Sequence, residues 1–283
     1  MISEEWLIRV NEEFRKSGVD QKRRPWEAIR RYSEEFKVPV NLSSNHAKRL
    51  FEWFEANSKP GVHKIGSMYE SVYFFDSAFW TISIPIVYGQ VELDGLKSLV
   101  GMPDQIKNIL MSDRKIAWDY AIFWADSVDY GLGIDDLRKS SGMNAFGLKL
   151  LMAGDQELRS AVAMLKQNRP DSRAILSCRM AVEIFLKAFI ALKIGLTEKE
   201  AKDLNHNLQK SFDRFIEVSG YNHWERVKEK LAIFPQIHER YNEQDMSLST
   251  LWEGFSIAQS LGVLIVREHT DRNTIEQIKP TQS

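Results

Sequence analysis

The segment 173–195, RAILSCRMAVEIFLKAFIALKIG, most constrains this chain, because its apolar residues recur at helical spacing. The apolar positions are Ile175, Cys178, Val182, Phe185, Phe189 and Leu192. Such a stripe forms one face of an α-helix and must be buried. Gly195 suits the left-handed position that ends a helix, and residues 197–200 form a capping box that starts another. The segment therefore predicts a long core helix.

A second, polar face of this predicted helix carries three charged residues at steps of four. Arg179, Glu183 and Lys187 share that face. If the face is solvated, the Glu183–Lys187 pair contributes about 0.2–0.5 kcal/mol to helix stability. The single cysteine, Cys178, lies on the apolar stripe instead, which favours a buried thiol over a nucleophile.

Four further helices are expected around this core helix. Their ranges are 155–168, 198–218, 224–239 and 248–268. Pro235 should break the third of them near Phe234. Five helices joined by short connections favour an antiparallel bundle, which we place at residues 150–270.

The first half of the chain, residues 1–145, has a different pattern. Helices are expected at 3–18, 25–37, 45–55, 94–100, 103–111 and 114–130. Strict alternation over 80–88 indicates a strand, with 72–75 as its partner across Asp76-Ser77 and Pro85 at an edge or a bulge. The sequence predicts a mainly α protein: an N-terminal α-rich or α+β domain with a short β-hairpin, a C-terminal helical bundle, and a flexible tail at 271–283.

Composition narrows the class of protein. The formal net charge is −1, which argues against an electrostatic grip on nucleic acid along the whole chain. One cysteine permits no intramolecular disulfide, which suits a reducing compartment. The N-terminal MISEEWLIRV lacks the apolar run of a signal peptide, and no stretch approaches the ~18 apolar residues that span a bilayer. We expect a cytoplasmic protein without a membrane segment.

The bundle region resembles the HEPN domains (higher eukaryote and prokaryote nucleotide-binding). Members carry a long helix reading A-x-E-x-x-L-K-A, a later H-x-L after a loop, and an R-Y element before the last helix. The matching residues here are Ala181, Glu183, Leu186, Lys187 and Ala188, then His206-Asn207-Leu208, then Arg240-Tyr241. The resemblance implies an up-and-down bundle over residues 150–270 that often pairs through its long helices. The apolar segment LGVLIV at 261–266 could supply such a homodimer face.

One departure from the family bears on activity. Its ribonuclease members carry an Arg followed, after four to six residues, by a His. None of the six histidines has an Arg at that distance upstream: Arg267 and His269 are two apart, and Arg240 follows His238. The resemblance therefore implies a non-catalytic nucleotide-binding or protein/RNA-interaction module, of the kind that serves prokaryotic defence or stress response.

His206 is the leading polar candidate, since a histidine at the mouth of a bundle can contact phosphate or transfer a proton. Lys187 and Asn207 are expected to contact the same ligand. Alternatively, His206 is a structural cap between two helices. A rival hypothesis is a divergent ribonuclease in which His206 works with Arg179, Arg240 or Arg267, within one chain or across a dimer.

A second candidate binding surface lies near the N-terminus, where cations are interleaved with aromatic residues. Its cations are Lys22, Arg23, Arg24, Arg30 and Arg31. Such a combination suits a nucleic-acid surface. The alternative is a solvated helix face whose charge is balanced by Glu27, Glu34 and Glu35.

Metal and cofactor sites have little support in the sequence. Asp126, Asp129, Asp135 and Asp136 surround a glycine-rich segment, expected to be a turn, and could offer oxygen ligands. They lack the order of a calcium-binding loop, so no metal and no cofactor is expected. The neighbouring aromatic residues, including Trp118 and Trp124, could form core or line a pocket, which leaves a small-molecule-binding dimer as a further alternative.

Overall fold

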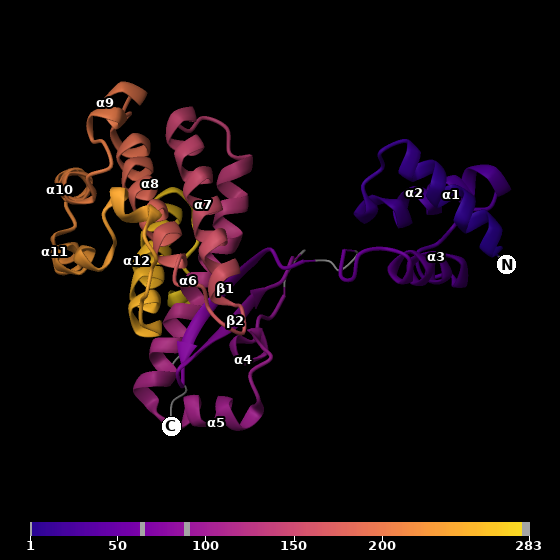
Figure 1. The fold of residues 1–283 in the computed structure, drawn as a ribbon, viewed down its shortest axis with the longest axis horizontal. Helices are drawn as coiled ribbons and strands as arrows, with labels where there is room; N and C mark the ends of the chain where they lie inside the picture. Colours follow the sequence, from indigo (N-terminus) through magenta and orange to yellow (C-terminus); the bar gives the residue numbers. More distant parts are fainter. Residues whose placement is uncertain (1, 63–65, 88–90, 279–283) are drawn as a thin grey trace. The chain divides into compact units, whose positions relative to one another are not determined.

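The computed structural model describes residues 2–62, 66–87 and 91–278 and is mainly helical with a small antiparallel sheet (Figure 1). It divides into two compact units, residues 1–66 and 67–283. The boundary expected near 145–150 falls inside the second unit, so the region 1–145 contributes to both. Each unit has its own hydrophobic core.

The first unit is built from three helices, α1 (Glu4–Lys16), α2 (Arg24–Phe36) and α3 (Asn45–Ala56), with a 3-10 turn at Gln21–Arg23. The three helices predicted in this region are confirmed. Serine side chains cap α1 and α3: Ser3 accepts the backbone N–H of Trp6, and Ser44 that of Ala47. The fully buried residues of the core are Leu7, Val10, Ala28, Leu50 and Phe54.

The predicted β-hairpin is confirmed in the second unit. Strands β1 (Tyr69–Phe75) and β2 (Ala78–Ile84) pair antiparallel, and the short β3 (Leu99–Val100) adds to the other edge of β2. The two turn residues, Asp76 and Ser77, have φ angles of 51° and 58°, as tight hairpin turns that follow the strand twist require. β2 ends directly before Pro85, and Tyr88 of the predicted strand lies outside the described residues.

The sheet is joined to the helices by a buried amide. Gln259 accepts hydrogen bonds from the Tyr69 hydroxyl (3.0 Å) and the Ser71 hydroxyl (2.5 Å), and donates to Ser127 (3.1 Å). These residues belong to β1, to α6 (Arg114–Lys139) and to α12 (Leu248–His269). Because these contacts connect positions nearly 190 residues apart, the sheet and the helices form one unit rather than separate domains.

The glycine-rich turn expected between Tyr130 and Ile134 is instead part of α6. A Cβ atom built at Gly131 would lie 2.6 Å from Cβ of Tyr69, and one at Gly133 would lie 2.1 Å from Cγ1 of Val266. The prediction of a turn was wrong because these glycines allow close packing against a strand and a helix.

The helices before α6 are α4 (Gly95–Ser98) and α5 (Asp104–Ser112).

Helix α8 (Ala174–Ile194) packs against α7 (Ala145–Leu165), α10 (Leu208–Ser219) and α12, and Figure 1 shows α7 and α12 running alongside it. The helical bundle is therefore present. Five residues of the predicted stripe are buried, while Leu192 is half-buried. Gly195 ends α8 with a φ of 76°, as predicted.

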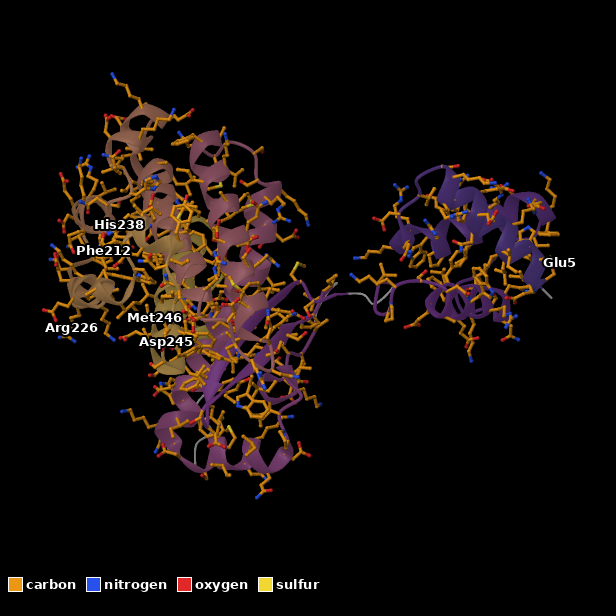
Figure 2. All side chains as sticks on the ribbon, in the orientation of Figure 1. Glu5, Phe212, Arg226, His238, Asp245 and Met246 are labelled. Atoms are coloured by element: carbon orange, nitrogen blue, oxygen red, sulfur yellow. The ribbon has the colours of Figure 1, made fainter. Side chains whose placement is uncertain are left out.

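The chain between α8 and α12 is more broken than the sequence indicates. The capping box of Thr197 and Glu200 is confirmed, but the helix expected at 198–218 is split into α9 (Glu198–Asp203) and α10. The expected helix 224–239 consists of short turns, interrupted at Phe234 before Pro235 as predicted. The turns are Asn222–Trp224, α11 (Glu225–Lys228), Glu229–Ile233 and Ile237–Tyr241. Figure 2 labels four residues along this part of the chain: Phe212, Arg226, His238 and Met246.

Helix α12 is buried where a dimer face was expected. Leu261, Val263 and Ile265 are at most 2% exposed within their own unit, so the segment 261–266 is unavailable to a second copy. By length and composition α12 could cross a membrane, but 61% of its most apolar 18-residue stretch is buried in the unit. Core helices of soluble proteins can share this length and composition.

The chain after α12 folds back onto α6. Residues Thr274–Gln277 form a 3-10 turn, and the backbone N–H of Thr274 donates to the Asp129 carboxylate at 2.9 Å. Residues 271–278, expected to be a flexible tail, are therefore anchored to the second unit. Residues 279–283 of that predicted tail lie outside the described part of the chain.

Candidate functional site

The charged face of α8 is buried rather than solvated. Arg179 and Glu183 are each 2% exposed, and Lys187 is 9% exposed. Oε2 of Glu183 lies 3.3 Å from Nη1 of Arg179, and Oε1 lies 2.9 Å from Nζ of Lys187. Buried charges are tolerated only when they are paired and hydrogen-bonded, so Glu183 is the hub of a three-residue ionic network.

Backbone carbonyls from the loop between α9 and α10 complete this network. Nη2 of Arg179 donates to the carbonyl of His206 at 2.8 Å, and Nζ of Lys187 donates to that of Asn205 at 2.6 Å. The turn that presents both carbonyls has Asn205 in the left-handed region, with a φ of 51°. Asparagine tolerates this region better than most residues. The ionic network therefore fixes the loop to α8.

The His206 side chain continues the network outward to solvent. Its Nδ1 atom lies 3.0 Å from Oε1 of Glu183, yet the side chain is 60% exposed. A carboxylate can only accept, so Nδ1 carries the proton in this contact. In the neutral ring, Nε2 is then an acceptor with its lone pair directed away from Glu183. His206 combines a fixed orientation with an accessible nitrogen.

A cavity of about 760 Å³ opens beside His206. Its apolar wall is formed by Leu208, Leu231, Phe234, Pro235 and Ile237. Its polar side chains are Asn205, His206, Asn207, Gln209, Gln236, Lys228, Glu229 and the edge of Arg179. Apolar walls with a few polar groups, in a volume of about 300–1,000 Å³, are typical of small-molecule sites. The arrangement can hold an apolar body and hydrogen-bond its polar groups.

The first turn of α10 forms part of this cavity through Leu208 and Gln209. The N-cap is Asn207, whose Oδ1 accepts the backbone N–H of Lys210 at 3.0 Å. Asn207, rather than His206, thus caps the N-terminus of α10 with its side chain. His206 nevertheless ties the loop to α8 through its carbonyl and Nδ1, so it combines a structural role with an exposed ring.

The structure brings together only some of the predicted catalytic candidates. Arg179 lies beside His206, but its guanidinium is committed to Glu183 and a carbonyl. Arg267 does not line this cavity and pairs with Asp126 (2.7 Å) and Asp129 (2.6 Å) of α6. Arg240 belongs to the turn Ile237–Tyr241, and its side chain lies outside the described part of the structure.

The acidic residues considered as metal ligands have other partners. Asp126 and Asp129 bind Arg267, Asp135 binds Lys139 at 2.5 Å, and Asp136 binds Arg272 at 2.8 Å. Burial, outweighing the nearby Arg267, raises the pKa of Asp126. Within the described ranges, no three metal-binding side chains come together.

The basic surface of the first unit is neutralised by neighbouring glutamates. Arg23 and Arg30 both bind Glu27, and their hydrogen bonds lower the pKa of that carboxyl. Arg30 also binds Glu34, at 2.8 Å. The remaining arginines are engaged as well: Arg31 binds Glu13 at 2.5 Å and Arg24 binds Asn11 at 3.0 Å. Lys22 is exposed, and its side chain forms no ion pair with the residues that the structure describes.

Two groups of site residues were missed by the sequence reasoning. Asn205 supplies the left-handed turn and a carbonyl, but the sequence reasoning placed it inside a single helix at 198–218; the available signal was that asparagine tolerates the left-handed region. Gln209 and Gln236 reach the cavity from separate segments. No local pattern marks such a convergence.

Three of the residues that carry the resemblance to HEPN domains lie at one site: Glu183 and Lys187 pair on α8, and His206 joins them from the following loop. The Arg240-Tyr241 element follows in the turn that leads toward α12. Neither a protein-family model, nor a curated protein, nor a solved structure matches this chain. Membership of the HEPN family consequently stays a prediction that rests on these residues.

Proposed function

We propose that residues 67–283 form a HEPN-like, non-catalytic binding module and that the cavity beside His206 holds a nucleotide, either free or as one unit of an RNA strand. The observation that carries the proposal is the exposed His206 ring, fixed by the buried Glu183 at 3.0 Å, at the edge of a cavity of about 760 Å³. Fixed polar groups beside an apolar wall give orientation and specificity to a bound ligand.

The lining suits the parts of a nucleotide. A base can pack against the apolar wall, which includes Leu231 and Phe234, and the amides of Gln209 and Gln236 can bind its edges. The outward Nε2 of His206 can accept a hydrogen bond from a ribose hydroxyl. The first turn of α10 lies at the same cavity, and first-turn N–H groups, which lack partners inside the helix, favour phosphate.

The electrostatics favour binding over cleavage. Transition-state charge on phosphate needs preorganised cations or donors aimed at it. Arg179 is 2% exposed and already engaged, and Lys228, the other cation on the described lining, lies 2.5 Å from Asp213. The charge of Glu183 is itself balanced by two cations. This arrangement orients a histidine but leaves no unpaired cation on the described lining to stabilise such charge.

The test is calorimetric titration of the protein with ribonucleoside monophosphates and with a short single-stranded RNA. We expect saturable binding that His206→Ala weakens at least about tenfold, since a well-placed hydrogen bond is worth on the order of 1.4 kcal/mol. The matched control is His223→Ala, which removes an exposed histidine outside the cavity and should leave affinity unchanged. Equal binding by wild type and His206→Ala, or no saturable binding to any of these ligands, contradicts the proposal.

A divergent ribonuclease is the second candidate, favoured by the orientation of His206. With Nδ1 held by Glu183, the outward Nε2 can take a proton from a ribose 2′-hydroxyl. Incubation with RNA and with the same sequence carrying 2′-deoxy nucleotides distinguishes the two candidates. Cleavage of RNA alone, lost in His206→Ala, would establish the enzyme and overturn the non-catalytic proposal.

The biological setting is proposed from the family resemblance alone. We place the protein in the cytoplasm, in prokaryotic defence or stress response. We also propose that it forms a homodimer through the bundle, by a face other than the buried segment 261–266. Sedimentation at several protein concentrations tests the dimer, and a monomer at all of them contradicts it.

A further inference from the structure

A second cavity, of about 980 Å³, lies elsewhere in the second unit. It is formed by the middle and end of α6, by Val87, Val91 and Leu93, and by the segment 269–278. It shares no lining residue with the cavity beside His206. Neither the HEPN resemblance nor the proposed function makes use of this space.

The inner wall of the cavity is apolar and fixed. Val128, Leu132 and Leu137 are at most 9% exposed and come from α6. Trp124, from the same helix, is held by a hydrogen bond of 3.1 Å from its Nε1 to the Ser98 hydroxyl. A wall that is already ordered costs a ligand little conformational entropy on binding.

The opposite wall, residues 270–278, is held in place by a buried carboxylate. Asp129 is fully buried and accepts the backbone N–H of Thr274 at 2.9 Å and its hydroxyl at 2.5 Å. Arg267 balances the charge of Asp129 at 2.6 Å. Nε of Arg272 donates to Asp136 of α6 at 2.8 Å, which adds a second attachment. The cavity is therefore a built feature rather than a gap beside a loose tail.

The polar edge of the cavity carries little charge and no excess of cations. Its ionised groups are Asp136, Asp271 and Arg272, two carboxylates and one guanidinium, which leaves −1. Burial lowers the pKa of His269, so its ring is uncharged at neutral pH. The other polar groups, which include Asn273, Gln277 and Ser140, are neutral donors and acceptors. Such an edge disfavours anions and suits an uncharged polar group.

We propose that this cavity is a binding site for an uncharged amphipathic small molecule, whose ring-sized apolar body packs against Trp124, Val128 and Leu132 and whose neutral polar group meets Asn273 and Gln277. The volume is at the upper end of the range of about 300–1,000 Å³ found for ligand sites. This function is independent of nucleotide binding at His206.

Two fluorescent probes with the same rings test the site. N-phenyl-1-naphthylamine is uncharged, and 1-anilinonaphthalene-8-sulfonate carries one negative charge. We expect the full-length protein to bind the neutral probe at least about tenfold more tightly than the sulfonate. The net negative charge of the edge repels the sulfonate, and transfer of that anion from water into the cavity costs free energy. Equal or tighter binding of the sulfonate overturns the proposal.

Variants locate the probe. Leu132→Trp fills the space beside the apolar wall and should abolish binding of the neutral probe. Ser140→Trp places a bulky ring on the polar edge, at an exposed position outside the core, and should weaken that binding. The matched control, Ala232→Trp, fills the cavity beside His206 and should leave the affinity unchanged. Unchanged binding in both cavity variants, or loss in Ala232→Trp alone, overturns the assignment. If Leu132→Trp does not fold, Ser140→Trp decides.

A charge variant tests the selectivity. Asp271→Lys changes the edge from −1 to +1 at an exposed residue. We expect the affinity for the sulfonate to rise at least about threefold relative to that for the neutral probe. The gain is modest because the interaction free energy between exposed charges is ~1 kcal/mol or less. No change in this ratio places the probes elsewhere and contradicts the proposal.

Discussion

Nδ1 of His206 lies 3.0 Å from Oε1 of Glu183, although the His206 side chain is 60% exposed and that of Glu183 is 3% exposed. A buried carboxylate thus orients a histidine at the surface. The same carboxylate holds Arg179 and Lys187, whose remaining donors bind the loop carbonyls at 205 and 206. The stability of the bundle and the geometry of the candidate site therefore depend on one residue.

Replacement of that hub should be strongly destabilising. We expect Glu183→Gln to lower the free energy of unfolding by about 3–5 kcal/mol, because two buried cations lose their counter-charge. Urea denaturation measures the change. The control is Glu198→Gln, which breaks an exposed i, i+4 pair with Lys202 and should leave the free energy of unfolding nearly unchanged. Similar small losses in both variants would show that the network contributes little.

The left-handed turn before His206 predicts a selective response at Asn205. Asn205→Gly should change the free energy of unfolding by less than about 0.5 kcal/mol, because glycine adopts positive φ freely. Asn205→Val should cost about 1–2 kcal/mol or more, since a branched side chain clashes there. Thermal unfolding of the two variants is compared. A valine variant as stable as the glycine variant would mean that the loop is not held in this conformation.

Close packing of α6 against α12 can be tested at Gly133. Gly133→Ala should lower the free energy of unfolding by about 1–3 kcal/mol, because the new methyl would lie 2.1 Å from Cγ1 of Val266. Gly66→Ala serves as control, because no described atom beyond the adjacent residues lies within 4 Å of the new Cβ. Adding Val266→Ala to Gly133→Ala should recover part of the loss. Strictly additive effects of the two substitutions would argue against the contact.

Stability should fall on mild acidification through His269. Burial lowers its pKa in the folded protein, so the unfolded chain, with a histidine pKa of about 6.5, binds more protons in this window. The free energy of unfolding therefore decreases as pH falls from about 6.5 toward the lowered folded pKa. His269→Gln should flatten the curve in this window. An unchanged slope in His269→Gln would refute this assignment.

Periodicity predicted the elements with strong patterns and failed where contacts decide. The core helix at 173–195 and the hairpin across Asp76-Ser77 carry local signals, an apolar stripe and strand alternation around a turn, and both are confirmed. Gly131 and Gly133 were predicted to form a turn, because their packing partners, Tyr69 and Val266, are distant in sequence and give no local signal. The expected helix at 224–239 is a series of short turns although Leu231 and Phe234 are buried, so its apolar spacing marked burial rather than a continuous helix.

The candidate site follows the same division. His206 was predicted from its residue type and position, but the sequence placed Glu183 and Lys187 only on a face that could be solvated, and the loop folds over that face. Arg267 was grouped with His206 by family analogy, whereas the structure pairs it with Asp126 and Asp129. Ion pairs between remote segments depend on the three-dimensional arrangement, which local spacing does not encode.

The sequence by itself determined a mainly helical protein with a β-hairpin, a buried helix at 173–195 and a histidine just beyond it. The reason is that the spacing of apolar residues in helices and strands is a property of residues close together in the chain. Only the tertiary structure decided that the sheet and the bundle share one core, that the ionic face of α8 is buried, and that residues 270–278 close a second cavity. These features depend on contacts between residues up to 190 positions apart, whose free energy no local pattern carries.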